Sequence, residues 1–285
     1  MTEQYEFAWH SGLFLLACLA LFLVARFTFK FFNNKLNISA ELTDKDNTAF
    51  YMPYMAYFIA FVMVIGGVMN SGGTNSFEKE LYYTLIYGTV GIVVLNLVAF
   101  ISGKVMHRQV DAWEEIKEGN IAVGILKGAS YLSTGIIISG VMLTEVDKPV
   151  EGAIFLVSAL LLAVIGFIYY NLITPFNIRN EIYSGNMAVA ASTAGAQIAF
   201  AILIYAGFQI EHATWVDSLI SISIDVLGGF ILLPLIRLVV DKVFIPKRRI
   251  TDELINQDIP NLGLGLFEAS AYIGGALLFI WCWNL

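Results

Sequence analysis

The sequence predicts an all-α membrane protein, a polytopic bundle of eight transmembrane helices built from four parallel two-helix repeats. Three observations lead to this prediction. The 285 residues are 58% hydrophobic and only 14% charged, whereas soluble domains are typically about 25% charged. The mean hydropathy is +0.74. Long apolar stretches alternate with short charged ones, and four of the short stretches share a motif.

Eight apolar stretches are long enough to cross a membrane, because a bilayer core of about 30 Å requires about 20 helical residues. They lie at residues 8–29, 49–69, 81–103, 121–143, 152–174, 187–209, 218–240 and 262–283. We expect the first to be a retained span rather than a signal peptide, because no Lys or Arg precedes it while Arg26 and Lys30 follow. The stretches occupy most of the chain, so no soluble domain of ordinary size is expected.

The basic residues predict the orientation of the chain. Thirteen of the sixteen Lys and Arg residues lie in or beside the loops after the first, third, fifth and seventh stretches. Lys79 and Lys148 lie on the other side, and Lys127 lies within a stretch. Because loops rich in Lys and Arg face the cytoplasm, we expect these four loops to be cytoplasmic and both termini to be outside.

These four loops share a motif in which a Glu is followed by an Asn at the start of the next span. The pairs are Glu41 and Asn47, Glu115 and Asn120, Glu181 and Asn186, and Glu253 and Asn261. Each period holds one inward and one outward helix, so the repeats are parallel and related by an axis along the membrane normal. The Asn is expected to cap the following helix. Two interpretations are open: the motif only caps, or four such loops form a cytoplasmic ring that binds a ligand or a partner.

Small residues recur four and eight positions after the motif Asn. The pairs are Gly124 and Gly128, Ala190 and Ala194, and Gly265 and Ala269, whereas the first repeat has Tyr51 and Met55. Small residues at this spacing allow helix backbones to approach closely in lipid. We therefore expect the last three Asn-led helices to form a tightly packed inner layer, and the first to face lipid or another subunit.

Two of the four loops carry a longer pattern. Residues 115–123 read EIKEGNIAV and residues 181–189 read EIYSGNMAV, each followed by a helix rich in small residues. This pattern resembles the YjfL-like bacterial membrane family, a domain of unknown function. The resemblance implies a multi-pass protein of the bacterial inner membrane, with two tandem four-helix copies at residues 1–143 and 144–285. It implies no reaction and supplies no site residues.

Three ionisable residues lie within predicted spans, where charges are costly unless they are paired or hydrated. Lys127 and Glu268 each lie seven residues after a motif Asn, so parallel repeats place them at equal depth. One interpretation is that they meet as an ion pair across a twofold axis and act as a gate. The other is a structural role, with Lys127 reaching to the interface.

Asp225 lies nearer the outer boundary of its span. It shares a helix face with Ser218 and Ser221, because residues three and four apart lie side by side on a helix. This polar stripe is expected either to line a hydrated cavity, with Asp225 as a cation or proton site, or to contact Asn96 or Gln197 on neighbouring helices.

No signature of an enzyme or cofactor site is evident. The sequence contains no phosphate-binding loop, dinucleotide fingerprint or nucleophile elbow. The two Cys and three His residues are scattered, which does not suit a metal site. We therefore predict no enzyme activity, no cofactor and no metal.

The leading functional hypothesis is a channel or transporter for a small polar solute or an ion, carried by Asp225, Glu268 and Lys127. The alternative is a membrane scaffold whose Glu-to-Asn loops recruit a cytoplasmic partner. The expected partners are the lipid bilayer, and further a second copy of the chain or a cytoplasmic protein. Nucleic acid is not expected, because the net charge is −7 and no large basic face is predicted.

Overall fold

The computed structural model describes residues 2–34, 36–71, 76–106, 111–145, 148–208 and 214–283. Within these ranges the chain contains helices and no strand. Eight helices are long and apolar enough to cross a membrane in this part of the chain. They are α1 (Thr2–Phe32), α2 (Thr48–Met69), α3 (Phe77–Met106), α5 (Ile121–Glu145), α6 (Pro149–Ile173), α8 (Met187–Gly207), α9 (Trp215–Val239) and α11 (Leu262–Trp283). All eight predicted spans are thus confirmed as helices.

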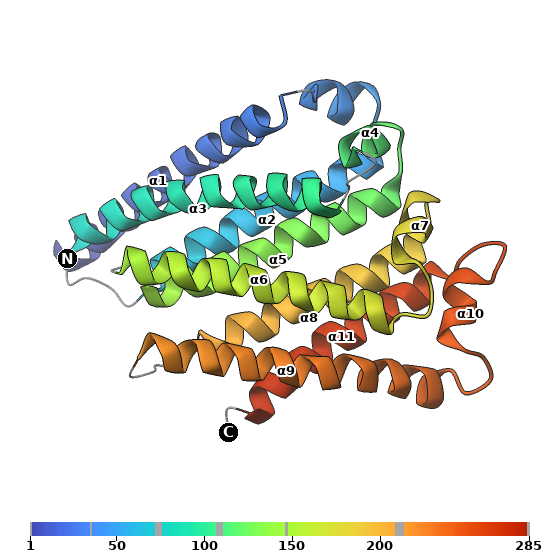
Figure 1. Ribbon diagram of the computed structural model, residues 1–285. Coiled ribbons are helices and arrows are strands. Elements are labelled where there is room, and N and C mark those ends of the chain that lie inside the picture. Colours follow the sequence, from blue (N-terminus) through green and yellow to red (C-terminus); the bar gives the residue numbers. More distant parts are fainter. Residues whose placement is uncertain are drawn as a thin grey trace.

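Short helical segments precede the four helices that begin with the motif Asn. They are η1 (Ala40–Asp44), α4 (Ala112–Lys117), α7 (Ile178–Tyr183) and α10 (Ile250–Ile255), and a further π-helical turn, η2 (Val240–Phe244), extends α9. The three short α-helices lie together at one end of the bundle (Figure 1). We call this end the motif end.

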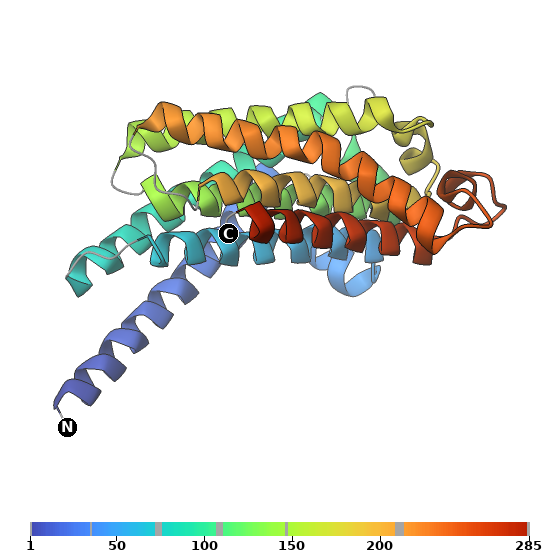
Figure 2. The ribbon, with the colours of Figure 1, turned by 90° about the horizontal axis from the view of Figure 1, so that it is seen from below.

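The helices that follow the motif form a single row in the order α2, α5, α8, α11, with each packed on the next. In the first half, α3 packs on α1, α2 and α5, and in the second half α9 packs in the equivalent way on α6, α8 and α11. Helices α6 and α9 lie together on one side of the row, and the beginning of α1 points away from the bundle (Figure 2). The two halves therefore have the same internal packing and stand side by side.

Small residues bring neighbouring helices of the row into backbone contact. A Cβ atom added to Gly124 of α5 would lie 2.3 Å from the carbonyl oxygen of Ala49 in α2, and one added to Gly265 of α11 would lie 2.3 Å from that of Ala188 in α8. The predicted small-residue spacing is thus used for close packing. In both cases the residue four positions after the motif Asn faces the preceding helix of the row.

The predicted ranking of the inner helices is correct for α5 and α8 and wrong for α11, whereas α2 packs on α5 in the row but leaves its other side open. In the most apolar part of α5 and of α8, 72% and 78% of the residues are buried, compared with 50% in α2 and only 22% in α11. The row is open, so α11 is covered by the row on one side only. Helix α2 joins the row because α5 supplies the glycines and α2 needs only Ala49, Ala56 and Ala60 opposite them.

Candidate functional site

The motif Asn caps its helix in all four repeats, as predicted. Each Asn side-chain oxygen accepts a hydrogen bond from the backbone N–H three residues later, at 3.1 to 3.3 Å; the bonds are Asn47 with Phe50, Asn120 with Val123, Asn186 with Val189, and Asn261 with Leu264. A free N–H at a helix start is costly in a membrane. The cap therefore has a clear structural role.

The side-chain amide of the same Asn makes further bonds within its own repeat. It donates to the motif Glu, at 2.7 Å for Asn47 and Glu41, 3.0 Å for Asn120 and Glu115, 2.9 Å for Asn186 and Glu181, and 3.2 Å for Asn261 and Glu253. All eight residues of the predicted motif are thus brought together as four pairs. The carboxylates hold the Asn side chains in place.

Three of the four Asn amides also bind the next repeat. Asn47 donates to the carbonyl oxygen of Ile116 (2.8 Å), and Asn186 donates to that of Leu254 (2.8 Å). Asn120 approaches the carbonyl oxygens of residues 182 and 183 at 3.3 Å. Asn261 is exposed and has no such bond among the described residues. The motifs therefore connect repeat one to two, two to three and three to four in an open chain, and the predicted ring is wrong.

Asn186→Ala is expected to lower the free energy of unfolding by about 2–4 kcal/mol. The loss of the cap costs about 1 kcal/mol, and a further 1–3 kcal/mol arises because Glu181 and the Leu254 carbonyl lose their donor. Asn261→Ala is the matched control, since it removes the cap and the Glu bond but no contact with another repeat. Its expected cost is about 1 kcal/mol. Equal losses in thermal unfolding of the two variants in detergent would contradict a role in joining repeats.

The motif Glu residues of the first and last repeats are held in their charged form. Burial of Glu41, which is 3% exposed, favours a raised pKa, but hydrogen bonds from Lys45 (2.7 Å) and Asn47 outweigh it and lower the pKa. The hydrogen bond from Arg248 (2.8 Å) lowers the pKa of Glu253. A carboxyl whose pKa is lower in the folded state stabilises the fold above its unfolded pKa.

Stability is therefore expected to fall as the pH drops below about 4.3, the ordinary pKa of Glu, and on through the lower folded pKa of Glu41. Glu41→Gln should flatten this part of the pH profile, because the amide does not titrate. The control is Glu78→Gln, which alters an exposed carboxylate at the opposite end. The measurement is the unfolding midpoint in detergent between pH 3 and pH 7. An unchanged acid limb in Glu41→Gln would contradict the role of this carboxylate.

Lys127 and Glu268 do not meet, which overturns the predicted ion pair. Lys127 is buried, with 9% of its surface exposed. Its Nζ lies over the ring of Trp113 in α4, 4.6 Å from the centroid, and 5.9 Å from that of Tyr131. No carboxylate lies within 4.0 Å of Nζ in the described part of the chain. Aromatic faces thus contact this cation in place of an acid.

Glu268 is fully buried in the second half and has a different cation beside it. The Nη1 atom of Arg237, in α9, lies 3.1 Å from its Oε1 atom. The Tyr272 hydroxyl donates to Oε1 (2.7 Å), and the Ser192 hydroxyl donates to Oε2 (2.6 Å). The hydroxyl of Tyr170 pairs in turn with that of Ser192 (2.9 Å). We call these five residues the Glu268 cluster.

The Glu268 cluster retains unsatisfied hydrogen-bonding atoms. Although Nη1 of Arg237 is within ion-pair distance of Glu268, its orientation makes no hydrogen bond, and the atom is buried. Outside the cluster, the hydroxyl of Thr193 is also buried, with no hydrogen-bond partner among the described residues. Most buried polar atoms in proteins are paired. Nη1 of Arg237 is therefore a spare donor beside a buried carboxylate.

Lys127 with its aromatic neighbours and the Glu268 cluster occupy equivalent places in the two halves. Lys127 and Glu268 are 141 residues apart in the sequence, as are Tyr131 and Tyr272. The same separation relates Arg237 to Asn96, whose amide donates to the Tyr57 hydroxyl at 2.9 Å. Arg237 was predicted to be one of the thirteen basic residues in or beside the cytoplasmic loops, and no role was predicted for these tyrosines. The 141-residue separation relates Arg237 to Asn96, which lies within a predicted span, and this relation would have predicted that Arg237 lies within the bundle.

Asp225 is buried in α9, with 6% of its surface exposed. It belongs to the helix face that also contains Ile222, Val226 and Gly229. A Cβ atom added to Gly229 would lie 2.5 Å from Leu203 of α8, so this face packs on the row. The nearby part of α9 is apolar apart from Asp225 and the serines.

Two cavities lie away from these charges. One, of about 1300 Å³, lies between α1 and α2, and the other, of about 650 Å³, lies beside α10. Neither is lined by Asp225, Glu268 or Lys127. Among the described residues, no three His, Cys, Asp or Glu side chains are grouped to hold a metal ion.

Comparison with known proteins reveals a duplicated family domain. The profile of the family described as Domain of Unknown Function (DUF350) matches residues 5–142 and again residues 145–283. The chain is also 21% identical over 251 residues to a UPF0719 transmembrane protein of Aquifex aeolicus (strain VF5), which covers 87% of this chain and 90% of that protein. No solved structure matches the chain significantly. The predicted resemblance to an uncharacterised bacterial membrane family in two tandem copies is confirmed, and the chain belongs to the DUF350 family.

Proposed function

We propose that the protein transports a small polar solute or an ion across the membrane in a proton-linked manner, with the Glu268 cluster as its proton-sensitive site. The observation that carries this proposal is a buried carboxylate with a cation and two hydroxyls on its two oxygens. Ionisable groups inside a membrane are costly, and they commonly mark ion pathways and proton relays.

The cluster forms a path of hydrogen bonds and one ion pair that begins at the motif end. There, Arg237 Nη2 donates to the Thr251 hydroxyl in α10 at 3.3 Å. From Arg237 the path continues through Glu268 and Ser192 to Tyr170. The Arg237 side chain is 14% exposed and Glu268 is not exposed, so access to the carboxylate runs past the guanidinium.

Asp225 and Lys127 have secondary roles in this proposal. Asp225 lies 12 residues before Arg237 on α9, which corresponds to about 18 Å along a helix, and would serve as a second carboxylate towards the opposite end. Lys127 occupies the position of Glu268 in the first half and would be a fixed positive charge there. We further propose that the protein is not an enzyme.

The proposed orientation follows from the basic loops. Because Lys and Arg favour the cytoplasmic side, we propose that the motif end faces the cytoplasm and that both termini are periplasmic, in a bacterial inner membrane. The path from Thr251 to Glu268 would then open to the cytoplasm.

The scaffold hypothesis receives less support from the loops. Its predicted working surface was the set of motif Glu residues, and their carboxylates are bonded to the Asn of the same repeat. Glu41 and Glu253 are also buried. A cytoplasmic partner would have to bind other groups of the motif end.

The test is proton flux into proteoliposomes that contain a pH-sensitive dye and carry an imposed potential. We expect Glu268→Gln and Asp225→Asn to abolish the flux, and Ser192→Ala to reduce it, because the Ser192 hydroxyl donates to Oε2 of Glu268. Ser223→Ala is the control, because among the described residues that hydroxyl in α9 bonds only to the Leu219 carbonyl. Folding of each variant is checked by gel filtration. Wild-type flux equal to that of empty liposomes, or equal flux in all folded variants, would refute the proposal.

A further inference from the structure

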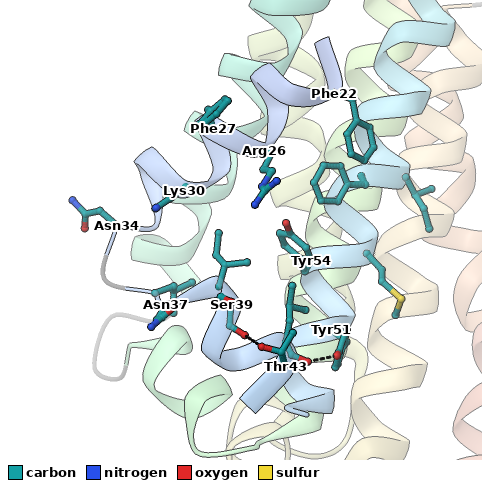
Figure 3. Close-up of a pocket in the computed structure, with 16 residues that line it drawn as sticks. Phe22, Arg26, Phe27, Lys30, Asn34, Asn37, Ser39, Thr43, Tyr51 and Tyr54 are labelled. Carbon is teal, nitrogen blue, oxygen red and sulfur yellow. Dashed lines mark hydrogen bonds between the residues drawn. The ribbon is translucent and has the colours of Figure 1, made fainter. Parts of the chain in front are cut away.

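The larger cavity is a groove on the open side of α2, at the motif end. It has a volume of about 1300 Å³ and lies between α1, α2 and the segment that contains η1 (Figure 3). Arg26 and Lys30 of α1 line it together with polar residues such as Asn37 and Ser39. Further into the membrane its walls are apolar, with Phe58 and Ile59 among them. The groove therefore has a basic, polar mouth and an apolar interior.

The groove occupies the place that a preceding helix takes elsewhere in the row. Residues four positions after the motif Asn face the preceding helix in α5 and α11, as Gly124 and Gly265 do. The equivalent residue of α2 is Tyr51, and it lines the groove. In the second half, Gln197 of α8 donates to Ser130 of α5 at 3.1 Å; its first-half counterpart, Phe58, also lines the groove. The side of α2 that lines the groove therefore corresponds to the side of α8 that packs on α5, and in the first repeat this side is open.

The side chains of α2 do not suit the packing of a further helix in this groove. Close helix packing uses small residues, and α2 has Tyr51 and Met55 at the two positions where α5 has Gly124 and Gly128. The Tyr51 hydroxyl also donates to the carbonyl of Leu42. The counterparts of this carbonyl in later repeats are those of Ile116 and Leu254, each of which accepts a bond from the motif Asn of the preceding repeat. The Leu42 carbonyl is thus already bonded within this chain. A flexible apolar occupant fits the groove better than a helix does.

The charges at the mouth indicate what such an occupant carries. Arg26 and Lys30 are four residues apart, so they lie on one face of α1. Both are exposed, and neither forms an ion pair with a carboxylate in the described ranges. Figure 3 shows Arg26 beside Tyr54 on the groove side of α1. Basic pockets between membrane helices bind the phosphate head groups of anionic lipids.

We propose that this groove is a binding site for one anionic phospholipid. Its phosphate lies between Arg26 and Lys30, and its acyl chains run along Met55, Phe58 and Ile59. The lipid takes the place of the missing helix and covers the open end of the row. The proposal concerns a surface remote from the Glu268 cluster and does not depend on transport.

The test is native mass spectrometry of the full chain in detergent with equal amounts of phosphatidylglycerol and phosphatidylcholine. We expect the wild type to retain one phosphatidylglycerol in preference to phosphatidylcholine. Combined Arg26→Gln and Lys30→Gln should weaken this retention about tenfold or more, since each cation near anionic lipid contributes several-fold. The matched control is combined Lys247→Gln and Arg249→Gln, which removes two exposed cations from the same end. This control should retain the lipid as the wild type does.

A second variant tests the groove without altering charge. Met55→Trp adds bulk to a groove-lining residue that is 49% exposed, and it should displace the lipid while the chain remains folded. Equal retention of the two lipids, or equal loss in the groove and control variants, would overturn the proposal. So would a lipid-free dimer that Met55→Trp disrupts, because the occupant would then be a second copy of the chain.

Discussion

Glu268→Ala is expected to lower the free energy of unfolding by about 3–5 kcal/mol, because it leaves the Arg237 guanidinium buried without its carboxylate. The loss also removes the acceptor for the Ser192 and Tyr272 hydroxyls. An unpaired charge is far more costly in a membrane interior than a missing hydrogen bond. The measurement is thermal or denaturant unfolding in detergent, followed by circular dichroism.

The double variant Arg237→Met with Glu268→Leu distinguishes the pair from general packing. Replacement of a buried ion pair by apolar residues of similar volume is often neutral or stabilising, so the double variant should recover most of the stability lost by either single change. This result would show that the pair is retained for function rather than for stability. The coupling between Arg237 and Glu268 would be contradicted if the double variant lost as much stability as the sum of the losses in Arg237→Met and Glu268→Leu.

Gly124→Val is expected to cost about 3 kcal/mol or more, at the upper end of the range for overpacked cores. A Cβ atom at this position would lie 2.3 Å from the Ala49 carbonyl oxygen and 3.2 Å from its Cα atom. These are backbone atoms, so the substitution can be accommodated only if α5 moves away from α2. Movement of α5 would also stretch the bond between Asn47 and the Ile116 carbonyl.

Gly66→Val is the matched control for this substitution. Gly66 also lies inside a helix of the row, but a Cβ atom added there would have no neighbour within 4 Å. The helix-propensity effect of Val in place of Gly is then the same in both variants, and only the steric effect differs. If the two variants have equal unfolding midpoints, close approach of α2 and α5 does not hold the row together.

The fold was predictable because its signals are local in the sequence. Apolar length alone locates the eight spans. The motif Asn predicts where α2, α5, α8 and α11 begin, because an Asn before an apolar run is a strong N-cap, and all four caps form. The small residues Gly124 and Gly265 likewise predict close contacts, which the structure contains.

The arrangement of the repeats was not predictable from the same signals. Parallel repeats are compatible with a closed ring and with an open row, and the motif is present in all four loops in either case. The distinguishing residues are Tyr51, whose hydroxyl occupies the Leu42 carbonyl at one end, and Asn261, whose amide has no next repeat at the other. A single sequence does not indicate which motif residues lack a neighbouring repeat to bind.

The candidate site was predicted in part. Glu268 was identified because charge is rare within an apolar span, but one of the two interpretations paired it with Lys127 from equal depth. Depth specifies a level in the membrane and not which helices are adjacent. In the open row, Glu268 faces α8 and α9, so Arg237 is within reach, while Lys127 belongs to the equivalent place in the first half beside Trp113.

The most direct test of the proposed role of Glu268 is infrared difference spectroscopy of the reconstituted protein during a pH jump on the side of the motif end. We expect a carboxyl C=O band that changes with the jump, disappears in Glu268→Gln and is retained in Glu78→Gln. We also expect Ser192→Ala to shift the band, because Ser192 donates to Oε2 of this carboxyl group. A spectrum that is the same in the wild type and in Glu268→Gln would contradict the claim that this carboxylate exchanges protons.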